Sequence, residues 1–144
     1  IVGSAFVADG DTLTINGTRI RLIDIDAPEL EQMCMDGQER DWPCGRQASA
    51  QLRSRVHGHD LRCQPKSIDK YGRTLATCAL PDGTDINAWM VQQGLAVTSG
   101  FANMYGAQQD EARSAKRGLW AGSFIPPREW RHQHPRTDNN NRKD

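Results

Sequence analysis

The sequence predicts an α+β domain in which helices pack on a small β-barrel. Short segments rich in β-branched and apolar residues follow one another from the N-terminus, and a two-residue turn signal at Asn16-Gly17 joins two of them. Segments with apolar residues at helical spacing lie between and after these strands. The chain has 144 residues. A single domain of this length buries roughly 68–70% of its unfolded surface, which is enough for a core.

The first strands are expected in "VGSAFV" and "DTLTI", and a third in "TRIRLIDI". If Asn16-Gly17 forms the turn, Thr12 lies opposite Arg21, and Asp11 lies one step away at the strand end. An acid and an arginine are therefore expected close together. Another hairpin is expected around residues 61–80, with "DKYG" at its turn.

Three helices are expected. The first runs from Gly45 to Val56, where apolar residues recur every four positions. The second follows Asp85, a favoured N-cap residue, and ends at Gly94. The third covers residues 103–117. Strands in a run, with helices inserted and appended, are typical of a barrel that carries helices on its outside.

The four cysteines predict two disulfides and hence an oxidising compartment. Of the three possible pairings, local sequence favours Cys34–Cys44, which brackets "CMDGQERDWPC", and Cys63–Cys78, which flank the "DKYG" turn at matching positions. Four buried reduced thiols are the alternative. Because no C-x-x-C occurs and the histidine pairs are far from ligand spacing, a zinc site is not expected.

Charge is balanced overall but unevenly placed. Eighteen basic and eighteen acidic residues cancel. Residues 1–32 hold six acids against two arginines, and residues 46–73 hold seven bases against two aspartates. An acidic and a basic segment on one small domain favour a joint site for a metal ion and a phosphate, whereas ordinary solvated faces are the alternative.

The stretch "DIDAPELE" places four acids within eight positions. Asp26 ends the third expected strand, and Pro28 favours an extended backbone before Glu29. Together with Asp11, these carboxylates can converge at one edge of the barrel. Carboxylates, a backbone carbonyl and water make a hard oxygen site that suits calcium. For each residue alone, a turn or an ordinary salt bridge is the alternative.

Three motifs, "DGDT", "RLIDIDAPE" and "DKYGR", occur in the order and rough spacing of the staphylococcal nuclease (thermonuclease) family, and the resemblance covers about residues 3–121. It implies an OB-fold, a five-stranded Greek-key β-barrel with three helices, and calcium-dependent cleavage of DNA and RNA. The stretches "APELEQMC", "DWPCGR", "GLWAGSF" and "PPREWR" resemble secreted bacterial members, in which the four cysteines are expected to be bridged.

Residue by residue, the resemblance implies the following site. The metal ligands are two carboxylates and one backbone carbonyl: Asp11, Asp26 and Ala27, the last standing where the prototype has Thr. The catalytic residues are Glu29, as general base or water-orienting group, and the phosphate-binding Arg21 and Arg73. Lys70 and Tyr71 match residues that contact another phosphate of the nucleotide.

One part of the resemblance is missing. The stretch "LAVTSGFANMYGAQ" has no clear match for the prototype tyrosines that pack on the base. Tyr105 and Phe101 are the candidates to replace them. The arginines and calcium suit a phosphodiester, because forked guanidinium donors match phosphate oxygens and the cation offsets the charge that grows during cleavage.

The leading hypothesis is a secreted or periplasmic, monomeric, calcium-dependent nuclease that acts on DNA and RNA with little sequence preference and needs no protein partner. The alternative is a non-catalytic OB-fold module that binds nucleic acid or a polyanion, for example in exopolysaccharide production. The complete set of five site residues favours the enzyme: Asp11, Arg21, Asp26, Glu29 and Arg73.

The ends of the chain are treated separately. Residues 1–123 are expected to form the nuclease-like domain, and residues 124–144 a polar, partly disordered extension. Residues after about Trp130 are expected to be dispensable for cleavage. The sequence begins at Ile1 without a Met, as a processed or trimmed chain does, and no run of eighteen apolar residues predicts a membrane span.

Overall fold

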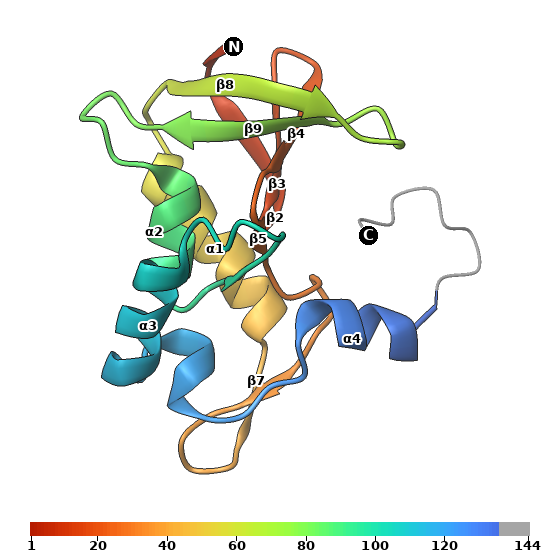
Figure 1. Cartoon of the computed structure of the whole chain (residues 1–144), viewed down its shortest axis with the longest axis vertical. Coiled ribbons are helices and arrows are strands. Elements are labelled where there is room, and N and C mark those ends of the chain that lie inside the picture. Colours follow the sequence, from red (N-terminus) through yellow and green to blue (C-terminus); the bar gives the residue numbers. More distant parts are fainter. Residues whose placement is uncertain (136–144) are drawn as a thin grey trace.

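The computed structural model describes residues 1–135 and confirms an α+β fold built on a nearly closed barrel (Figure 1). The main sheet has the strand order β1-β8-β9-β4-β3-β2. Its strands are β1 (Val2–Gly3), β2 (Ala5–Asp9), β3 (Thr12–Ile15), β4 (Thr18–Leu22), β8 (Leu61–Ile68) and β9 (Thr74–Ala79).

The two outermost strands of this sheet, β1 and β2, come from one stretch of chain interrupted only at Ser4. Its first part pairs with β8 and its second part with β3, so this one stretch joins both edges of the sheet. Counted as one bent strand, it leaves the five strands expected of an OB-fold. The parallel pairing of β4 with β9 completes a sheet in which all other neighbours are antiparallel.

The hairpin expected at Asn16-Gly17 is confirmed. Both turn residues have positive φ angles, as this tight turn requires. Thr12 pairs with Arg21, as the spacing predicts. Asp11 therefore lies at the mouth of the β3–β4 hairpin, beside the strand that carries Arg21.

The β8–β9 hairpin confirms both the strand pairing and the cysteine pairing. Cys63 lies directly opposite Cys78 and is bonded to it, and Cys34 is bonded to Cys44. A register shift between Pro65 and Ser67 adds one residue to β8. The pairing near the turn is therefore displaced by one position from the expected register, while the cysteines match it.

Four α-helices are present among the described residues: α1 (Cys44–Val56), α2 (Ile86–Gln92), α3 (Gly106–Ala115) and α4 (Pro127–Gln133). The first three were expected, although α3 begins three residues later than its predicted start. Asp85 caps α2 by accepting a hydrogen bond from the Ala88 N–H. Helix α4 lies in the segment that the sequence analysis left outside the fold. A 3-10 helix, η1 (Gly118–Ala121), precedes it.

Two short strand pairs complete the fold: β5 (Ile25–Asp26) with β10 (Val97–Thr98), and β6 (Cys34–Met35) with β7 (Asp41–Trp42). The main core lies between the barrel and the helices, with α1 packed against β2 and α2 against β9 and α3. Ala48, Leu52 and Val56, the apolar face predicted for α1, are all buried in it.

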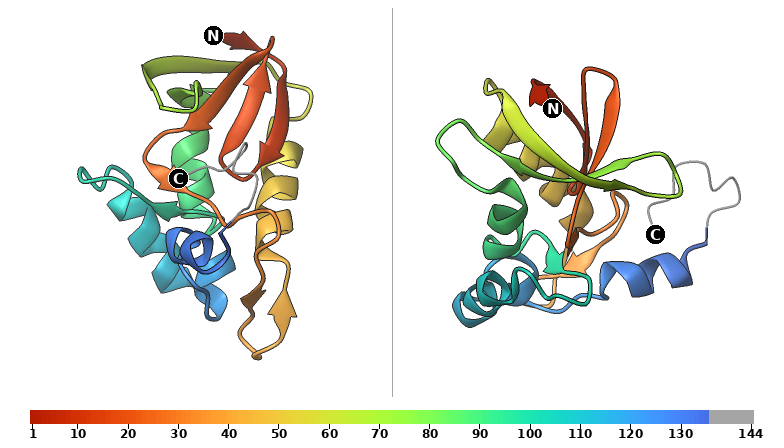
Figure 2. Two further views of the ribbon diagram at one scale, coloured as in Figure 1. Left: turned by 90° about the vertical axis from the view of Figure 1, so that its right-hand side faces the viewer. Right: turned by 45° about the horizontal axis from the view of Figure 1, so that its top comes forward.

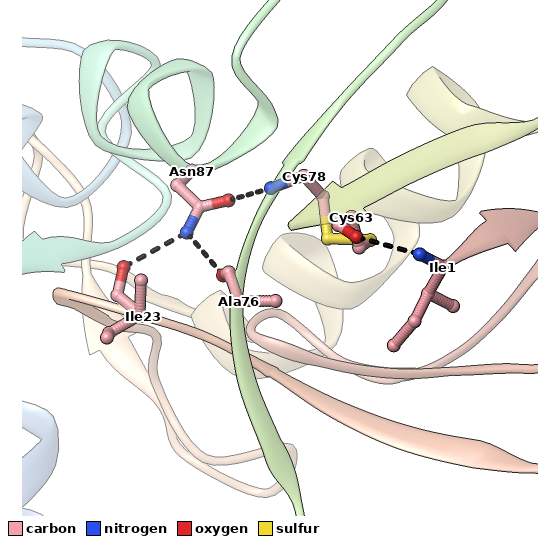
Figure 3. Close-up of a disulfide and its surroundings, with 6 residues drawn as sticks. All are labelled: Ile1, Ile23, Cys63, Ala76, Cys78 and Asn87. Atoms are coloured by element: carbon pink, nitrogen blue, oxygen red, sulfur yellow. Dashed lines mark hydrogen bonds between the residues drawn. A yellow bond between two sulfur atoms is a disulfide. The ribbon is translucent and has the colours of Figure 1, made fainter. Parts of the chain in front are cut away.

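A buried amide ties α2 to the barrel beside the Cys63–Cys78 disulfide (Figure 3). Asn87 accepts a hydrogen bond from the Cys78 N–H at 3.1 Å and donates to the carbonyls of Ile23 and Ala76. It thereby joins β9 to the chain that leaves β4. This chain continues directly into β5 and Asp26, so the bonds of Asn87 help to fix the backbone on which the candidate site is built.

The β8–β9 turn and α4 project from the same side of the barrel, with β5 between them (Figures 1 and 2). The β8–β9 turn and α4 therefore lie on either side of the acidic stretch that follows β4.

Candidate active site

Arg21 joins the two carboxylates that the sequence analysis assigns to a metal. Its guanidinium lies 3.5 Å from Asp11 Oδ2 and 3.5 Å from Asp26 Oδ1. Its Nη1 also donates to the carbonyls of Leu22 and Ile25, at 2.8 and 2.9 Å. These backbone bonds hold the arginine at the point where β4 ends and β5 begins. The expected proximity of acid and arginine is therefore present, with a second acid added.

Asp11 is fully buried in the turn between β2 and β3. Its Oδ2 accepts a hydrogen bond from the Ala27 N–H at 2.7 Å, and its Oδ1 accepts one from the Thr12 hydroxyl at 3.1 Å. Gly10 allows this close approach, because a Cβ there would lie 2.7 Å from the Ala27 side chain and 2.9 Å from Ala48. The "DGDT" turn is thus packed directly beneath the acidic stretch.

Asp26 lies in β5 and is paired by an arginine from the other end of the chain. Arg131 of α4 donates from Nη1 to Asp26 Oδ1 and from Nη2 to Asp26 Oδ2, each at 3.1 Å. Both side chains are nearly inaccessible to solvent. Burial alone lowers the pKa of Arg131, but the hydrogen bonds and charge of Asp26, together with Glu29 and Asp11, outweigh it and raise the pKa.

The backbone of Glu29 packs closely against Gly45 in the first turn of α1. A Cβ on Gly45 would lie 1.7 Å from the Glu29 carbonyl oxygen, so only glycine fits at this position. The buried Gln32 accepts a hydrogen bond from the Glu29 N–H, and the Glu29 carboxylate lies 3.9 Å from Arg131 Nε. Glu29 and Asp26 therefore approach the same guanidinium.

Arg73 leaves the β8–β9 turn and is buried. Its Nε donates to Asp69 Oδ2 at 2.8 Å, and its backbone N–H donates to Asp69 Oδ1 at 3.0 Å. Burial raises the pKa of Asp69, but the hydrogen bonds from Arg73 and Tyr71 outweigh this and leave the pKa below its ordinary value. The bond to Nε fixes the Arg73 guanidinium in the lining of the cleft described below.

Lys70 and Tyr71 lie at the tip of this turn. The Lys70 ammonium is 5.2 Å and the Arg73 guanidinium 5.4 Å from the centre of the Tyr71 ring, both within cation–π range. The Tyr71 carbonyl also accepts a hydrogen bond from Arg19. Lys70 and Tyr71 lie in the turn between Asp69 and Arg73, two residues that line the cleft described next, but do not line it themselves.

A cleft of about 480 Å³ opens between the β8–β9 turn and α4. Its lining contains three of the expected site residues, Arg21, Asp26 and Arg73. Asp69 lines it as well, and α4 contributes Arg128, Arg131 and His132. Asp11 and Glu29 lie behind this surface, in contact with Arg21 and Arg131 respectively.

The donor types present suit a hard cation, but in this structure Arg131 occupies both oxygens of Asp26, so a cation would have to displace or share these bonds. Asp11 and Asp26 lie against the same guanidinium, and the N–H of Ala27, the residue after Asp26, donates to Asp11. These are oxygen ligands of the kind that calcium prefers, with water completing a shell of about six to eight. Within residues 1–135, no group of three or more carboxylate, histidine or cysteine side chains is arranged to hold a metal ion. A cation here would thus have two carboxylates, Asp11 and Asp26, with a backbone carbonyl and water as its ligands.

The two aromatic residues considered for base stacking differ sharply in exposure. Tyr105 is buried in the main core, and burial, with the nearby charge of Asp85, raises its pKa to about 12. It is therefore not available to stack on a base. Phe101 is fully exposed in the loop before α3.

Residues 19–122 match the family model described as "Staphylococcal nuclease homologue". The chain belongs to the staphylococcal nuclease homologue family. This family match spans the site residues from Arg21 to Arg73. Asp11 and α4 lie outside the matched range.

Curated relatives in the family carry different names. The chain is 37% identical over 123 residues to the "Succinoglycan biosynthesis protein ExoI" of Rhizobium meliloti, which covers 83% of this chain and 64% of ExoI. It is 36% identical to an "Uncharacterized endonuclease" of Escherichia coli O157:H7, covering 88% of this chain and 82% of that protein. It is 33% identical to the "Micrococcal nuclease" of Shigella flexneri, covering 87% and 76% respectively.

Sequence reasoning missed the contribution of α4 to this nuclease-homologue site. Two signals were available: Pro126-Pro127 favours a helix start, and Arg128, Arg131 and His132 follow at i, i+3, i+4 spacing, which places them on one helix face. The expectation of a dispensable tail after Trp130 conflicts with the burial of Arg131. We therefore restrict that prediction to residues beyond α4. The domain boundary at residue 123 stays a prediction.

Proposed function

We propose that this chain is a calcium-dependent nuclease that hydrolyses phosphodiester bonds of DNA and RNA with little sequence preference. One observation supports this most directly: Asp11 and Asp26 meet at Arg21, and Arg21, Asp26 and Arg73 line one cleft. Carboxylates that suit a hard cation thus lie beside two forked cations that suit a phosphate. The endonuclease and micrococcal nuclease names among its relatives agree with this assignment.

In the proposed reaction, Asp11, Asp26 and the Ala27 carbonyl hold calcium, which when bound would polarise the phosphate and offset its negative charge. Arg21 and Arg73 bind the phosphate from two sides of the cleft, and their guanidinium groups stabilise the charge that grows on its oxygens. Asp69 orients Arg73 through Nε. The backbone carbonyls of Leu22 and Ile25 accept from Nη1 of Arg21 and so fix the position of its guanidinium.

Glu29 is the proposed general base or water-orienting group. Its carboxylate lies beside Arg131, which also contacts Asp26, so the base is held near the proposed cation ligand. A carboxylate there can accept the proton of an attacking water. Lys70 and Tyr71, at the tip of the β8–β9 turn, are proposed to contact a neighbouring phosphate.

The two disulfides agree with a secreted or periplasmic protein, which we propose here. Within residues 1–135, no helix combines the length and apolar character needed to cross a membrane. We further propose that the chain acts as a monomer without a protein partner.

A second candidate is a non-catalytic module of the same fold that binds nucleic acid or an anionic polysaccharide. The name of ExoI, a succinoglycan biosynthesis protein, favours it. This candidate predicts that the protein binds the polymer without cleaving it, whereas the nuclease predicts binding and cleavage.

Digestion of supercoiled plasmid and of single-stranded RNA, with calcium and with chelator, separates the two candidates. The nuclease predicts cleavage of both substrates only with calcium, and its loss in Glu29→Gln. Glu31→Gln serves as the control, because Glu31 is exposed and pairs with Arg46 outside the cleft. Binding without cleavage under every metal condition would support the non-catalytic module instead.

A further inference from the structure

We propose that α4 forms a second phosphate-binding wall of the cleft, with Arg128 as the residue that contacts the nucleic-acid backbone next to the cleaved phosphate. The inference rests on the proposed nuclease function. It extends that function beyond the residues of the family match, which ends at residue 122. The ligand chemistry is a phosphodiester backbone long enough to reach from Arg21 to α4.

Helix α4 is held firmly enough to serve as a wall. Arg131 of the helix is buried and paired with the buried Asp26 of β5. Pro127, the first residue of the helix, is buried as well. Just before the helix, the Ile125 carbonyl accepts a hydrogen bond at 2.7 Å from the buried Gln32. Side chains on this helix therefore have defined positions relative to Asp26.

Arg128 has the charge and the exposure that phosphate binding needs. It is exposed, lines the cleft, and has no ion pair with any of residues 1–135. Arg131 differs, because Asp26 neutralises it. His132 lies four residues from Arg128 on the same helix face and also lines the cleft. Glu129, the acid of α4, does not line it.

Arg128 is the arginine of the cleft lining that forms no ion pair within residues 1–135. Four arginines line the cleft against three aspartates: Arg21, Arg73, Arg128 and Arg131 face Asp24, Asp26 and Asp69. Two of the aspartates are already paired, Asp26 with Arg131 and Asp69 with Arg73. Asp11 and Glu29, which contact Arg21 and Arg131 from outside the lining, offset the remaining positive charge, and a calcium ion bound at Asp26 would restore it.

The position of Arg128 identifies which phosphate it would contact. It precedes Arg131 by three residues, a rise of about 4.5 Å along the helix. Arg131 lies on Asp26, beside the proposed point of cleavage, so Arg128 is displaced along the strand from that point. We therefore expect a neighbouring phosphate of a longer chain, but not a dinucleotide centred at Arg21, to contact it.

The first test measures binding without metal. A fluorescent single-stranded thymidine oligonucleotide is titrated in chelator at several salt concentrations with wild type, Arg128→Gln and Arg62→Gln. Arg62 is an exposed β8 residue outside the cleft lining, so its variant removes the same charge elsewhere. We expect Arg128→Gln alone to bind about tenfold more weakly. The slope of log K against log salt should fall by about 0.7, the value for one lost phosphate contact.

The second test measures cleavage with calcium. Arg128→Gln should raise KM for the oligonucleotide about tenfold with little change in kcat, and should leave cleavage of a dinucleotide unchanged. If wild type binds but does not cleave, the proposed function fails while the salt-slope comparison still decides the role of α4. If Arg128→Gln matches Arg62→Gln in slope and KM, or if wild type binds no oligonucleotide in chelator, the proposal is overturned.

Discussion

Arg131 donates two parallel hydrogen bonds to Asp26 across 105 residues of sequence, each with a length of 3.1 Å. This pair connects the C-terminal helix to the proposed calcium ligand. Both side chains are nearly buried, so neither charge can be compensated by water if the other is removed.

Two truncations test the importance of this pair. Removing residues 136–144 should leave cleavage and stability unchanged. Removing residues 126–144 should lower the free energy of unfolding by about 1.5–3 kcal/mol, because the charged hydrogen bonds between Arg131 and Asp26 are lost, while Arg21 still lies beside Asp26. Urea denaturation of the two truncated proteins measures the difference. Equal stability in both would show that the Arg131–Asp26 pair contributes little.

Replacing Asp26 and replacing Glu29 should affect calcium binding and turnover differently. Asp26→Ala should weaken calcium binding and cleavage together, because it removes a proposed ligand. Glu29→Gln should preserve calcium and nucleotide binding but lower kcat, because the amide keeps the shape and cannot accept a proton. Calorimetric calcium titration and steady-state kinetics measure the two effects, with Glu31→Gln as control. Equal, small effects at both positions would mean that the acidic stretch is only a solvated loop.

Arg73→Lys should retain the positive charge but lose the forked donor and the Nε bond to Asp69. We expect a cost of about 3 kcal/mol in transition-state stabilisation, or on the order of a hundredfold in kcat/KM. Arg62→Lys, at an exposed position on β8, is the matched control. Kinetics indistinguishable between these two variants would remove Arg73 from the catalytic set.

The Cys63–Cys78 disulfide should stabilise the barrel mainly by restricting the unfolded chain. The cysteines are 15 residues apart, and a loop of this length corresponds to about 3 kcal/mol. A Cys63→Ala/Cys78→Ala double variant should lose roughly this much in the free energy of unfolding. Thermal and urea unfolding, compared with wild type under non-reducing conditions, provide the measurement. An unchanged stability would contradict the loop-entropy argument.

Stability at alkaline pH should depend on Tyr105. Burial, then the charge of Asp85, raises the pKa of Tyr105 to about 12, whereas its ordinary value is 10.0. Between these values the unfolded tyrosine loses its proton while the folded one keeps it. The folded state then binds more protons, so the free energy of unfolding falls as pH rises through this window and is unaffected below it.

Tyr105→Phe isolates this effect. The variant should lose less stability than wild type between pH 10 and about 12, although it starts lower because the hydroxyl contacts are gone. Urea unfolding at closely spaced pH values gives the comparison. Parallel curves for the two proteins would rule out Tyr105 as the titrating group.

Local sequence was sufficient wherever one segment determines its own geometry. Asn16-Gly17 fixes a tight turn, and this turn fixes the pairing of Thr12 with Arg21. The same reasoning predicted α1 from its apolar spacing and the position of Cys63 opposite Cys78. Pro65 indicated that the register of this hairpin is only approximate, but the one-residue size of the shift between Pro65 and Ser67 was not predicted, because it depends on how the partner strand is held.

The proximity of Asp26 and Arg131 was decided only by the tertiary structure. No spacing rule connects residues 105 positions apart. The charged and polar sequence of α4 favoured the prediction of a solvated extension. The helix docks because its one buried arginine meets a buried carboxylate. The sequence by itself determined which residues can bind a cation or a phosphate. Long-range packing determined which of them share a cleft, because a buried ion pair forms only when folding brings both charges together.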